Sequence, residues 1–167
     1  MKKISIIVPA YNEEESIPYL EKRLVALMNN MKNYEFEVLF VNDGSKDKTL
    51  ELIKNLRERD ERFCYVNFSR NFGKEIAMIA GLDYATGDAV ILIDADLQDP
   101  PELIPELVKY WEQGYDDVYA KRKSRKGDTF LKKFTSKMYY KVLQSLTNVE
   151  IQKDTGDFRL LDRRCVN

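Results

Sequence analysis

Short apolar runs alternate along the chain with longer segments whose apolar residues recur at helical spacing. The runs at residues 3–8, 36–41, 63–68 and 89–93 are rich in β-branched or aromatic residues and too short for typical helices, so each predicts a strand. Helices are predicted over residues 16–31, 46–59, 75–86 and 101–113, and a fifth, short strand over residues 117–120. Four strand–helix repeats predict an α/β domain with a mostly parallel central sheet and right-handed crossovers.

A cluster of acids follows the apolar run at residues 89–93. Asp94, Asp96 and Asp99 stand at the carboxyl end of this predicted buried strand, with Gln98 among them. Like charges this close repel one another unless a cation or hydrogen-bond donors offset the cost. Mg²⁺ or Mn²⁺ would do so, because hard cations take oxygen ligands and often use only one or two carboxylates plus substrate phosphates. We therefore predict a metal site here; a solvated acidic turn in which Asp99 caps the next helix is the alternative.

Polar loops follow four of the predicted strands, at Pro9, Asn42, Ser69 and Asp94. In open α/β sheets the carboxyl ends of the strands share one edge, and ligands bind there, so this edge is the predicted site. The chain has no G-x-x-x-x-G-K-[ST] motif, and no G-x-G-x-x-G follows the first strand. A P-loop NTPase and a dinucleotide cofactor are therefore disfavoured. A nucleotide ligand whose phosphates are bound through a metal remains possible.

Amino-acid composition restricts the chemistry further. The chain has 167 residues, 44% hydrophobic and 33% charged, as expected for one globular domain with its own core. It contains no histidine, so a histidine base and histidine metal ligands are excluded. Any catalysis must therefore use carboxylates, Lys, Arg or a metal. Cys64 and Cys165 lack a framework spacing, which suits a reducing cytoplasm. No apolar run approaches the roughly 20 residues of a membrane span, and the residues before the first predicted strand do not have the apolar segment and cleavage site expected of a signal peptide.

Positive charge is concentrated in one segment. Residues 121–141 carry nine Lys or Arg and one acid, Asp128, so this segment has a net charge of +8 and the rest of the chain −9. The asymmetry indicates an anionic partner met at one place. Residues 129–146 combine an apolar stripe with flanking lysines, which fits a helix lying in a membrane interface and fits equally a core-packed helix with a solvated lysine face. Nucleic acid is disfavoured as the partner of the basic patch at residues 121–126, because no base-stacking aromatics are interleaved with its basic residues.

Five motifs, taken in order, resemble family 2 glycosyltransferases of the GT-A fold. They are PAYNEEE at Pro9–Glu15, NDGSKDKT at Asn42–Thr49, SRNFGKE at Ser69–Glu75, DADLQDPPE at Asp94–Glu102 and TGDFRLLDR at Thr155–Arg163. Within this family the chain looks like the polyprenyl-phosphate sugar transferases, the group of dolichol-phosphate mannosyltransferase and the bactoprenol glucosyltransferases. The resemblance covers essentially the whole chain. It implies a GT-A nucleotide-sugar-binding fold and one catalytic domain, residues 1–167, cut before C-terminal membrane-associated segments.

The resemblance also implies roles on the donor side of the reaction. Pro9, Tyr11 and Glu13 in the first loop, with Asp43 in the second, would hold the base and ribose of a nucleotide sugar. Without the resemblance, the first loop also fits a capped helix start, and Asp43 fits a turn before Gly44.

The diphosphate and the acceptor would be met by other motifs. Lys74 and Arg122 would lie near the diphosphate, although Lys74 also fits a solvated first residue of a helix. Asp157 would be the acceptor-side catalytic carboxylate; a turn acid paired with Arg159 or Arg163 is the alternative. The metal ligands implied by the resemblance, carrying Mg²⁺ or Mn²⁺ on the diphosphate, are Asp94, Asp96 and Gln98.

The implied activity is inverting, metal-dependent transfer of a hexose from a UDP- or GDP-sugar to a polyprenyl phosphate at the cytoplasmic face of the membrane. The basic helix at residues 129–146 would hold the chain at the membrane surface. A family 2 transferase with a soluble or polysaccharide acceptor, and a nucleotide-sugar-binding module without turnover, are the alternatives. The sequence chooses neither the sugar nor the nucleotide, and it leaves a homo-oligomer open.

Overall fold

The computed structural model describes residues 1–121 and 155–166. Of these, residues 1–119 and 157–166 belong to one compact unit. None of the helices in these described ranges has the length and apolar composition needed to cross a membrane. In chain order the elements are β1 (Lys2–Ala10), α1 (Ile17–Asn30), β2 (Tyr34–Asn42), α2 (Thr49–Arg59), β3 (Phe63–Asn67), α3 (Lys74–Tyr84), β4 (Ala89–Leu92), the 3-10 helix η1 (Pro101–Leu103), α4 (Ile104–Glu112), β5 (Asp117–Lys121), β6 (Thr155–Asp162) and α6 (Arg163–Val166).

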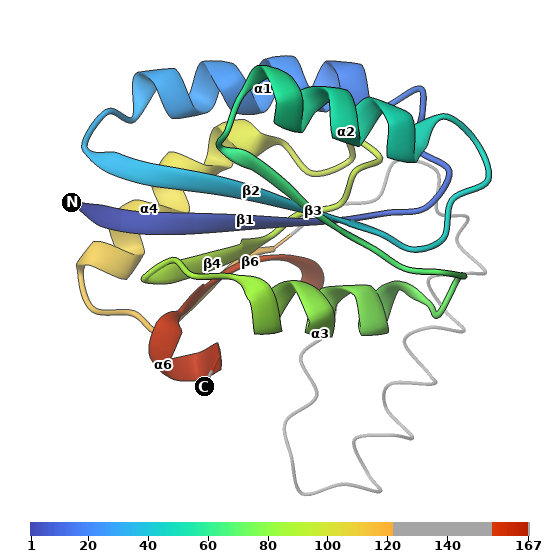
Figure 1. The fold of residues 1–167 in the computed structure, drawn as a ribbon. Coiled ribbons are helices and arrows are strands. Elements are labelled where there is room, and N and C mark those ends of the chain that lie inside the picture. The colour runs from blue at the N-terminus through green and yellow to red at the C-terminus, as the bar shows by residue number, and fades with distance from the viewer. Residues whose placement is uncertain (122–154, 167) are drawn as a thin grey trace, which may run out of the picture. The chain divides into compact units, whose positions relative to one another are not determined.

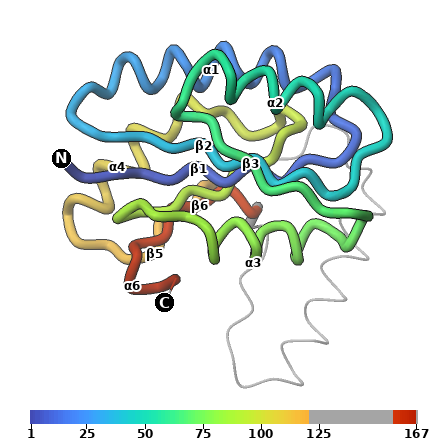
Figure 2. The backbone as a smooth tube through the Cα atoms, in the orientation of Figure 1, coloured from blue at the N-terminus to red at the C-terminus, as the bar shows by residue number. Residues whose placement is uncertain are grey.

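Six strands form one sheet in the order β3-β2-β1-β4-β6-β5. The first four strands of the chain pair in parallel, whereas β6 runs antiparallel to β4. Figure 2 shows β6, near the end of the chain, beside the middle strands. The predicted mostly parallel α/β sheet is therefore confirmed. The last of the five motifs, for which the sequence predicted no strand, forms the antiparallel strand.

The centre of the sheet is largely apolar. Every residue of β4 is buried, and so are Ile4, Ile6 and Ile7 of the neighbouring β1. Helices α1 and α2 lie over one face of the sheet and α3 lies over the other (Figure 1). A strand covered on both faces needs apolar residues at every position, which explains the uninterrupted run at residues 89–92. Burying each such Ile side chain contributes about 1.5–3 kcal/mol.

Helix α2 begins three residues later than the predicted start at residue 46. Ser45, which directly precedes the predicted helix, accepts the backbone N–H of Asn12 through Oγ at 3.0 Å. Asp47 accepts the backbone N–H of Thr49 at 3.0 Å, so the helix starts there. The displaced start leaves Ser45 free to tie the β1–α1 loop to the β2–α2 loop.

Helix α3 ends at Tyr84, before the predicted end at residue 86, and Gly87 does not serve as its C-cap. Gly87 is not among the glycines with positive φ. A Cβ atom on this residue would lie 2.6 Å from the backbone nitrogen of Ser5 in β1 and 2.7 Å from its Oγ. Glycine is therefore needed here because the chain crosses β1 too closely for a side chain.

Candidate functional site

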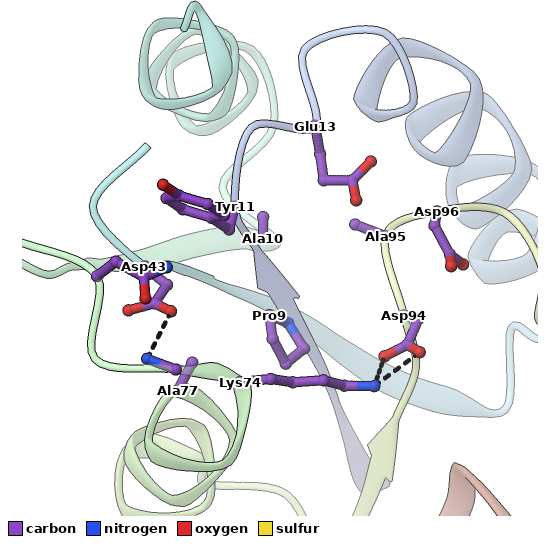
Figure 3. A pocket seen from close by; sticks show the side chains of 12 residues that line it. Pro9, Ala10, Tyr11, Glu13, Asp43, Lys74, Ala77, Asp94, Ala95 and Asp96 are labelled. Carbon is purple, nitrogen blue, oxygen red and sulfur yellow. Dashed lines mark hydrogen bonds and ion pairs between the residues drawn. The ribbon is translucent and has the colours of Figure 1, made fainter. Parts of the chain in front are cut away.

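Four loops at the carboxyl edge of the sheet enclose a pocket of about 300 Å³. In Figure 3, Tyr11 and Asp43 lie at one end of the pocket and Asp94 and Asp96 at the other, and the Lys74 side chain extends between them. The edge predicted from the strand–loop pattern is thus where the four loops meet. Of the predicted site residues, those that line the pocket are Pro9, Tyr11, Glu13, Asp43, Lys74, Asp94 and Asp96.

Negative charge dominates the described lining of this pocket. Four lining side chains, Glu13, Asp43, Asp94 and Asp96, are carboxylates, and one, Lys74, is cationic. An anionic ligand such as a diphosphate would meet repulsion from these carboxylates. The pocket therefore suits a phosphate ligand only together with an additional cation.

Lys74 bridges two acids that lie far apart in the sequence. Its Nζ is 2.7 Å from Oδ1 and 2.8 Å from Oδ2 of Asp94, and 2.7 Å from Oδ2 of Asp157. Burial lowers the pKa of Lys74, but the hydrogen bonds and negative charges of the two aspartates outweigh it and raise this pKa above its ordinary value. Lys74 therefore stays an ammonium and joins the two carboxylates.

The antiparallel strand explains how Asp157 reaches this place. In the β4–β6 ladder Leu92 pairs with Arg159, and continuing this register by two residues sets Asp94 opposite Asp157. The alternative partners for Asp157 are engaged elsewhere: Arg159 lies 3.6 Å from Asp117. The guanidinium of Arg163 donates to the carbonyl oxygens of residues 85 and 87, each at 2.8 Å. Asp157 thus belongs to the Lys74 cluster and not to a turn.

Asp43 contributes to the site by holding the loop after β3. Its side chain is buried, and its two oxygens accept the backbone N–H groups of Phe72 at 2.7 Å and Gly73 at 2.9 Å. Gly44 has a φ of +66°, and a Cβ on it would lie 2.6 Å from the backbone nitrogen of Asn71 and nearer still to the preceding carbonyl carbon. The Asp43–Gly44 pair therefore fixes residues 70–73 and, through them, the start of α3 at Lys74.

Asp94 and Asp96 offer the donors of a small metal site. Both line the pocket, and the backbone N–H of Gln98 donates to Oδ1 of Asp96 at 3.0 Å across Leu97, which has a φ of 64°. Within residues 1–121 and 155–166, no group of three or more acids or cysteines is placed to hold a metal alone. Two carboxylates completed by substrate phosphates still fit Mg²⁺ or Mn²⁺. Gln98, the third predicted metal ligand, does not line this pocket as the structure describes it.

A second, adjoining pocket of about 540 Å³ was not predicted from the sequence. It shares Tyr11 and Asn71 with the first pocket. Asn42 and Asn67 also line it; they pair in register at the ends of β2 and β3, and Nδ2 of Asn42 donates to Oδ1 of Asn67 at 2.7 Å. The Oδ1 of Asn42 is buried without a hydrogen-bond partner. The signal in the sequence was an asparagine at the end of each of two successive strands.

Two further sequence predictions lie outside the described residues. These are Arg122, assigned to the diphosphate, and the basic amphipathic helix at residues 129–146. Both remain predictions.

The fold and the pocket define an α/β domain with an acidic pocket at the carboxyl edge of its sheet. Residues 5–167 match the family model described as Glycosyl transferase family 2. The chain belongs to this family, and the sheet of six strands flanked by helices is its GT-A-like fold, as the resemblance implied.

Relatives of known name agree with this assignment. The chain is 54% identical over 99% of its length to an uncharacterized glycosyltransferase of Synechocystis, and 49% identical over 98% to a prophage bactoprenol glucosyl transferase homolog of Escherichia coli. It covers 52% and 53% of these proteins, so it spans about half the length of the curated relatives it matches. A solved structure of S. aureus TarS 1-349 in complex with UDP-GlcNAc superposes with a TM-score of 0.62, at 26% identity, over 76% of this chain and 36% of that chain.

Proposed function

We propose that this chain is the catalytic domain of an enzyme that transfers a hexose from a nucleotide sugar to a polyprenyl phosphate at the cytoplasmic face of the membrane. The observation that carries the proposal is the cluster in which Lys74 joins Asp94, assigned to the donor side, with Asp157, assigned to the acceptor side. A single transfer needs both substrates within bonding distance of each other, and this cluster offers such a meeting point. The similarity to bactoprenol glucosyl transferases supports a lipid phosphate as the acceptor.

The donor would lie along the first pocket. Tyr11 and Asp43 at one end would contact the base and ribose, and Asp94 and Asp96 at the other would hold the metal on the diphosphate. The excess of carboxylates in the lining supports metal dependence, because a diphosphate needs added positive charge there. When bound, Mg²⁺ or Mn²⁺ would stabilise the charge that develops on the departing nucleoside diphosphate. Lys74 and Arg122 would add positive charge at the same leaving group.

The acceptor would approach from the side of Asp157. A phosphate oxygen of the lipid would attack the anomeric carbon while the bond from that carbon to the diphosphate breaks, with inversion in one in-line displacement. A phosphate acceptor is already an anion, so Asp157 would orient it or take its last proton. In a chain without histidine, a carboxylate next to the transfer point is well suited to this role.

Membrane attachment forms a further part of the proposal. The lysines and apolar stripe at residues 129–146 would hold the domain at an anionic surface, close to a lipid acceptor. Residues 1–167 would act as one catalytic domain. Because the curated relatives are about twice as long, the activity of the whole protein is proposed from this part alone.

A transfer assay tests the proposal directly. The chain would be incubated with radiolabelled UDP- or GDP-sugars, Mg²⁺ or Mn²⁺, and a polyprenyl phosphate in detergent; we expect label in the lipid extract and stoichiometric release of nucleoside diphosphate. A thermal-shift panel would first select the donor, since a ligand at 100 times its Kd adds about 2.7 kcal/mol of stability. Release only with a soluble or polysaccharide acceptor would assign another family 2 activity. Donor binding without any release would indicate a binding module.

A further inference from the structure

Both oxygens of Asp94 are occupied by the same ammonium group. The Nζ of Lys74 contacts Oδ1 at 2.7 Å and Oδ2 at 2.8 Å, and it also contacts Asp157 at 2.7 Å. These are the lengths of strong, charge-assisted hydrogen bonds. The lysine therefore holds the position from which a divalent ion would bind both oxygens of Asp94.

We propose that Lys74 is an internal counterion of Asp94 and Asp157. Its ammonium group stays bound to these carboxylates until the diphosphate of the donor replaces them as its partner, so that metal and donor bind together. The inference rests on the proposed donor and metal chemistry and adds a role for Lys74 as a positioning residue. It differs from a simple diphosphate contact, because it makes the lysine a competitor of the metal in the donor-free protein.

Competition follows from charge and space. A divalent ion binds carboxylate oxygens at about 2.0–2.6 Å, and a second cation hydrogen-bonded to both oxygens of the same carboxylate would be repelled by it. Asp96 remains beside this pair as an exposed carboxylate lining the pocket. One carboxylate alone is a weak site for a hard cation, so the donor-free protein binds the metal poorly.

The donor weakens the competition between Lys74 and the metal, because its diphosphate offers the ammonium group another anion to bind. Lys74 is the first residue of α3, its side chain is 41% exposed, and its flexible stem can turn toward a diphosphate in the pocket. That turn frees Asp94 for the metal and Asp157 for the acceptor in one movement. Metal and donor affinities are then coupled, and by thermodynamic linkage each raises the other by the same factor.

Mn²⁺ binding measured without turnover tests the inference. The free Mn²⁺ signal in electron paramagnetic resonance gives the Kd for the parent and for Lys74→Met, Lys74→Gln and Lys74→Arg, each alone and with UDP or GDP. Lys46→Met is the control, because Lys46 is an exposed lysine that lines the adjoining pocket. Without nucleotide, we expect Lys74→Met and Lys74→Gln to bind Mn²⁺ at least about fivefold more tightly than the parent, the lower end of typical coupling between sites. Lys74→Arg and Lys46→Met should stay near the parent value.

The outcomes separate the two proposals. If Lys74→Met and Lys74→Gln keep the parent's nucleotide-free Mn²⁺ affinity, or if Lys46→Met tightens it equally, Lys74 does not compete with the metal. If neither UDP nor GDP strengthens Mn²⁺ binding to the parent, the proposed donor and metal chemistry fails. The nucleotide-free comparison still decides the role of Lys74 in that case. Two neutral replacements of different polarity keep the test valid if one of them folds poorly.

Discussion

The ammonium nitrogen of Lys74 lies 2.7 Å from Oδ2 of Asp157, although 83 residues separate the two along the chain. The first belongs to the start of α3 and the second to the antiparallel strand β6. Through this contact the acid assigned to the acceptor is held at the edge of the donor pocket. Replacements at Asp157 therefore test whether this acid acts in turnover or in donor binding.

Asp157→Asn keeps the shape of the side chain and removes its charge. We expect donor affinity to stay within a few-fold, because the pocket contacts assigned to base, ribose and metal are untouched. The transfer rate should fall by about 10²–10⁴, the usual contribution of a positioned acid or base, and by less if the acceptor phosphate arrives fully ionised. Calorimetry measures the donor Kd of the variant and the parent, and an assay at saturating donor measures their transfer rates.

Asp117→Asn is the matched control for Asp157→Asn, since Asp117 pairs with Arg159 of the same strand at 3.6 Å and does not contact Lys74. It should transfer sugar close to the parent rate. A parent-like rate in Asp157→Asn, or a loss of donor binding in it, would contradict the assigned role.

Asp96→Ala should abolish metal-dependent donor binding, because it removes one of the two carboxylates that line the pocket beside the diphosphate position. Gln98→Ala keeps the backbone N–H that donates to Asp96, so it isolates the contribution of the neutral side chain and should weaken donor binding less than Asp96→Ala. Nucleotide-sugar Kd with Mn²⁺ and with EDTA measures both. Should Asp96→Ala bind the donor in EDTA as tightly as the parent does with Mn²⁺, the metal assignment is wrong.

Two glycines with positive φ give a test of the loop after β3. Gly44→Ala meets the backbone of residues 70 and 71, whereas Gly114→Ala, at a φ of +99°, meets nothing within 4 Å. Both introduce about 1 kcal/mol of backbone strain, and Gly44→Ala must in addition displace the loop that Asp43 holds. Urea unfolding should show the larger loss, above about 2 kcal/mol, for Gly44→Ala, together with weaker donor binding. Equal losses would mean that this packing does not position the loop.

The basic segment can be tested on vesicles. Replacing Lys132, Lys133, Lys137 and Lys141 with Glu should abolish co-sedimentation with anionic liposomes, because each Lys near such a surface contributes about 1 kcal/mol. Replacing the same residues with Gln should weaken binding by a smaller amount. Parent-like co-sedimentation of the Glu variant would assign this segment to ordinary packing.

Periodicity predicted the elements because the burial of each one leaves a pattern in its own sequence. The four residues of β4 are all buried, and they appear in the chain as an unbroken apolar run. Helix α1 was predicted from apolar spacing, and Leu20, Leu24 and Leu27 are buried in it. The edge where the loops meet followed from the parallel strand order alone.

Contacts between distant segments left no such pattern. Strand β6 begins with Thr155 and Gly156, and it pairs with a strand more than 60 residues earlier in the chain. Asp157 could therefore be assigned by resemblance, while its bond to Lys74 could not be predicted. Likewise, the resemblance assigns Asp43 to the base and ribose, and nothing local in the sequence shows that its oxygens also hold the backbone of residues 72 and 73.

Asp162 at the end of β6 predicts how stability changes in acid. Hydrogen bonds from the side chain and backbone N–H of Arg164, and from Nε1 of Trp111 at 2.6 Å, lower the pKa of Asp162 to about 2. An unfolded aspartate titrates near 3.9, so the folded state binds this proton less readily. The stabilising contribution is therefore complete above about pH 5 and is lost as the pH falls from about 4 to about 2.

Asp162→Asn should consequently be less stable than the parent at pH 6, and the difference should shrink as the pH approaches 2. Urea unfolding of both proteins at pH 6, 4 and 3 gives this difference directly. Arg164→Met removes only the side-chain hydrogen bond of Arg164 and should show a smaller loss with the same pH trend, because the backbone N–H of residue 164 and Nε1 of Trp111 still donate to the carboxylate. A difference between Asp162→Asn and the parent that stays constant from pH 6 to pH 3 would show that the charge of Asp162 does not stabilise the fold.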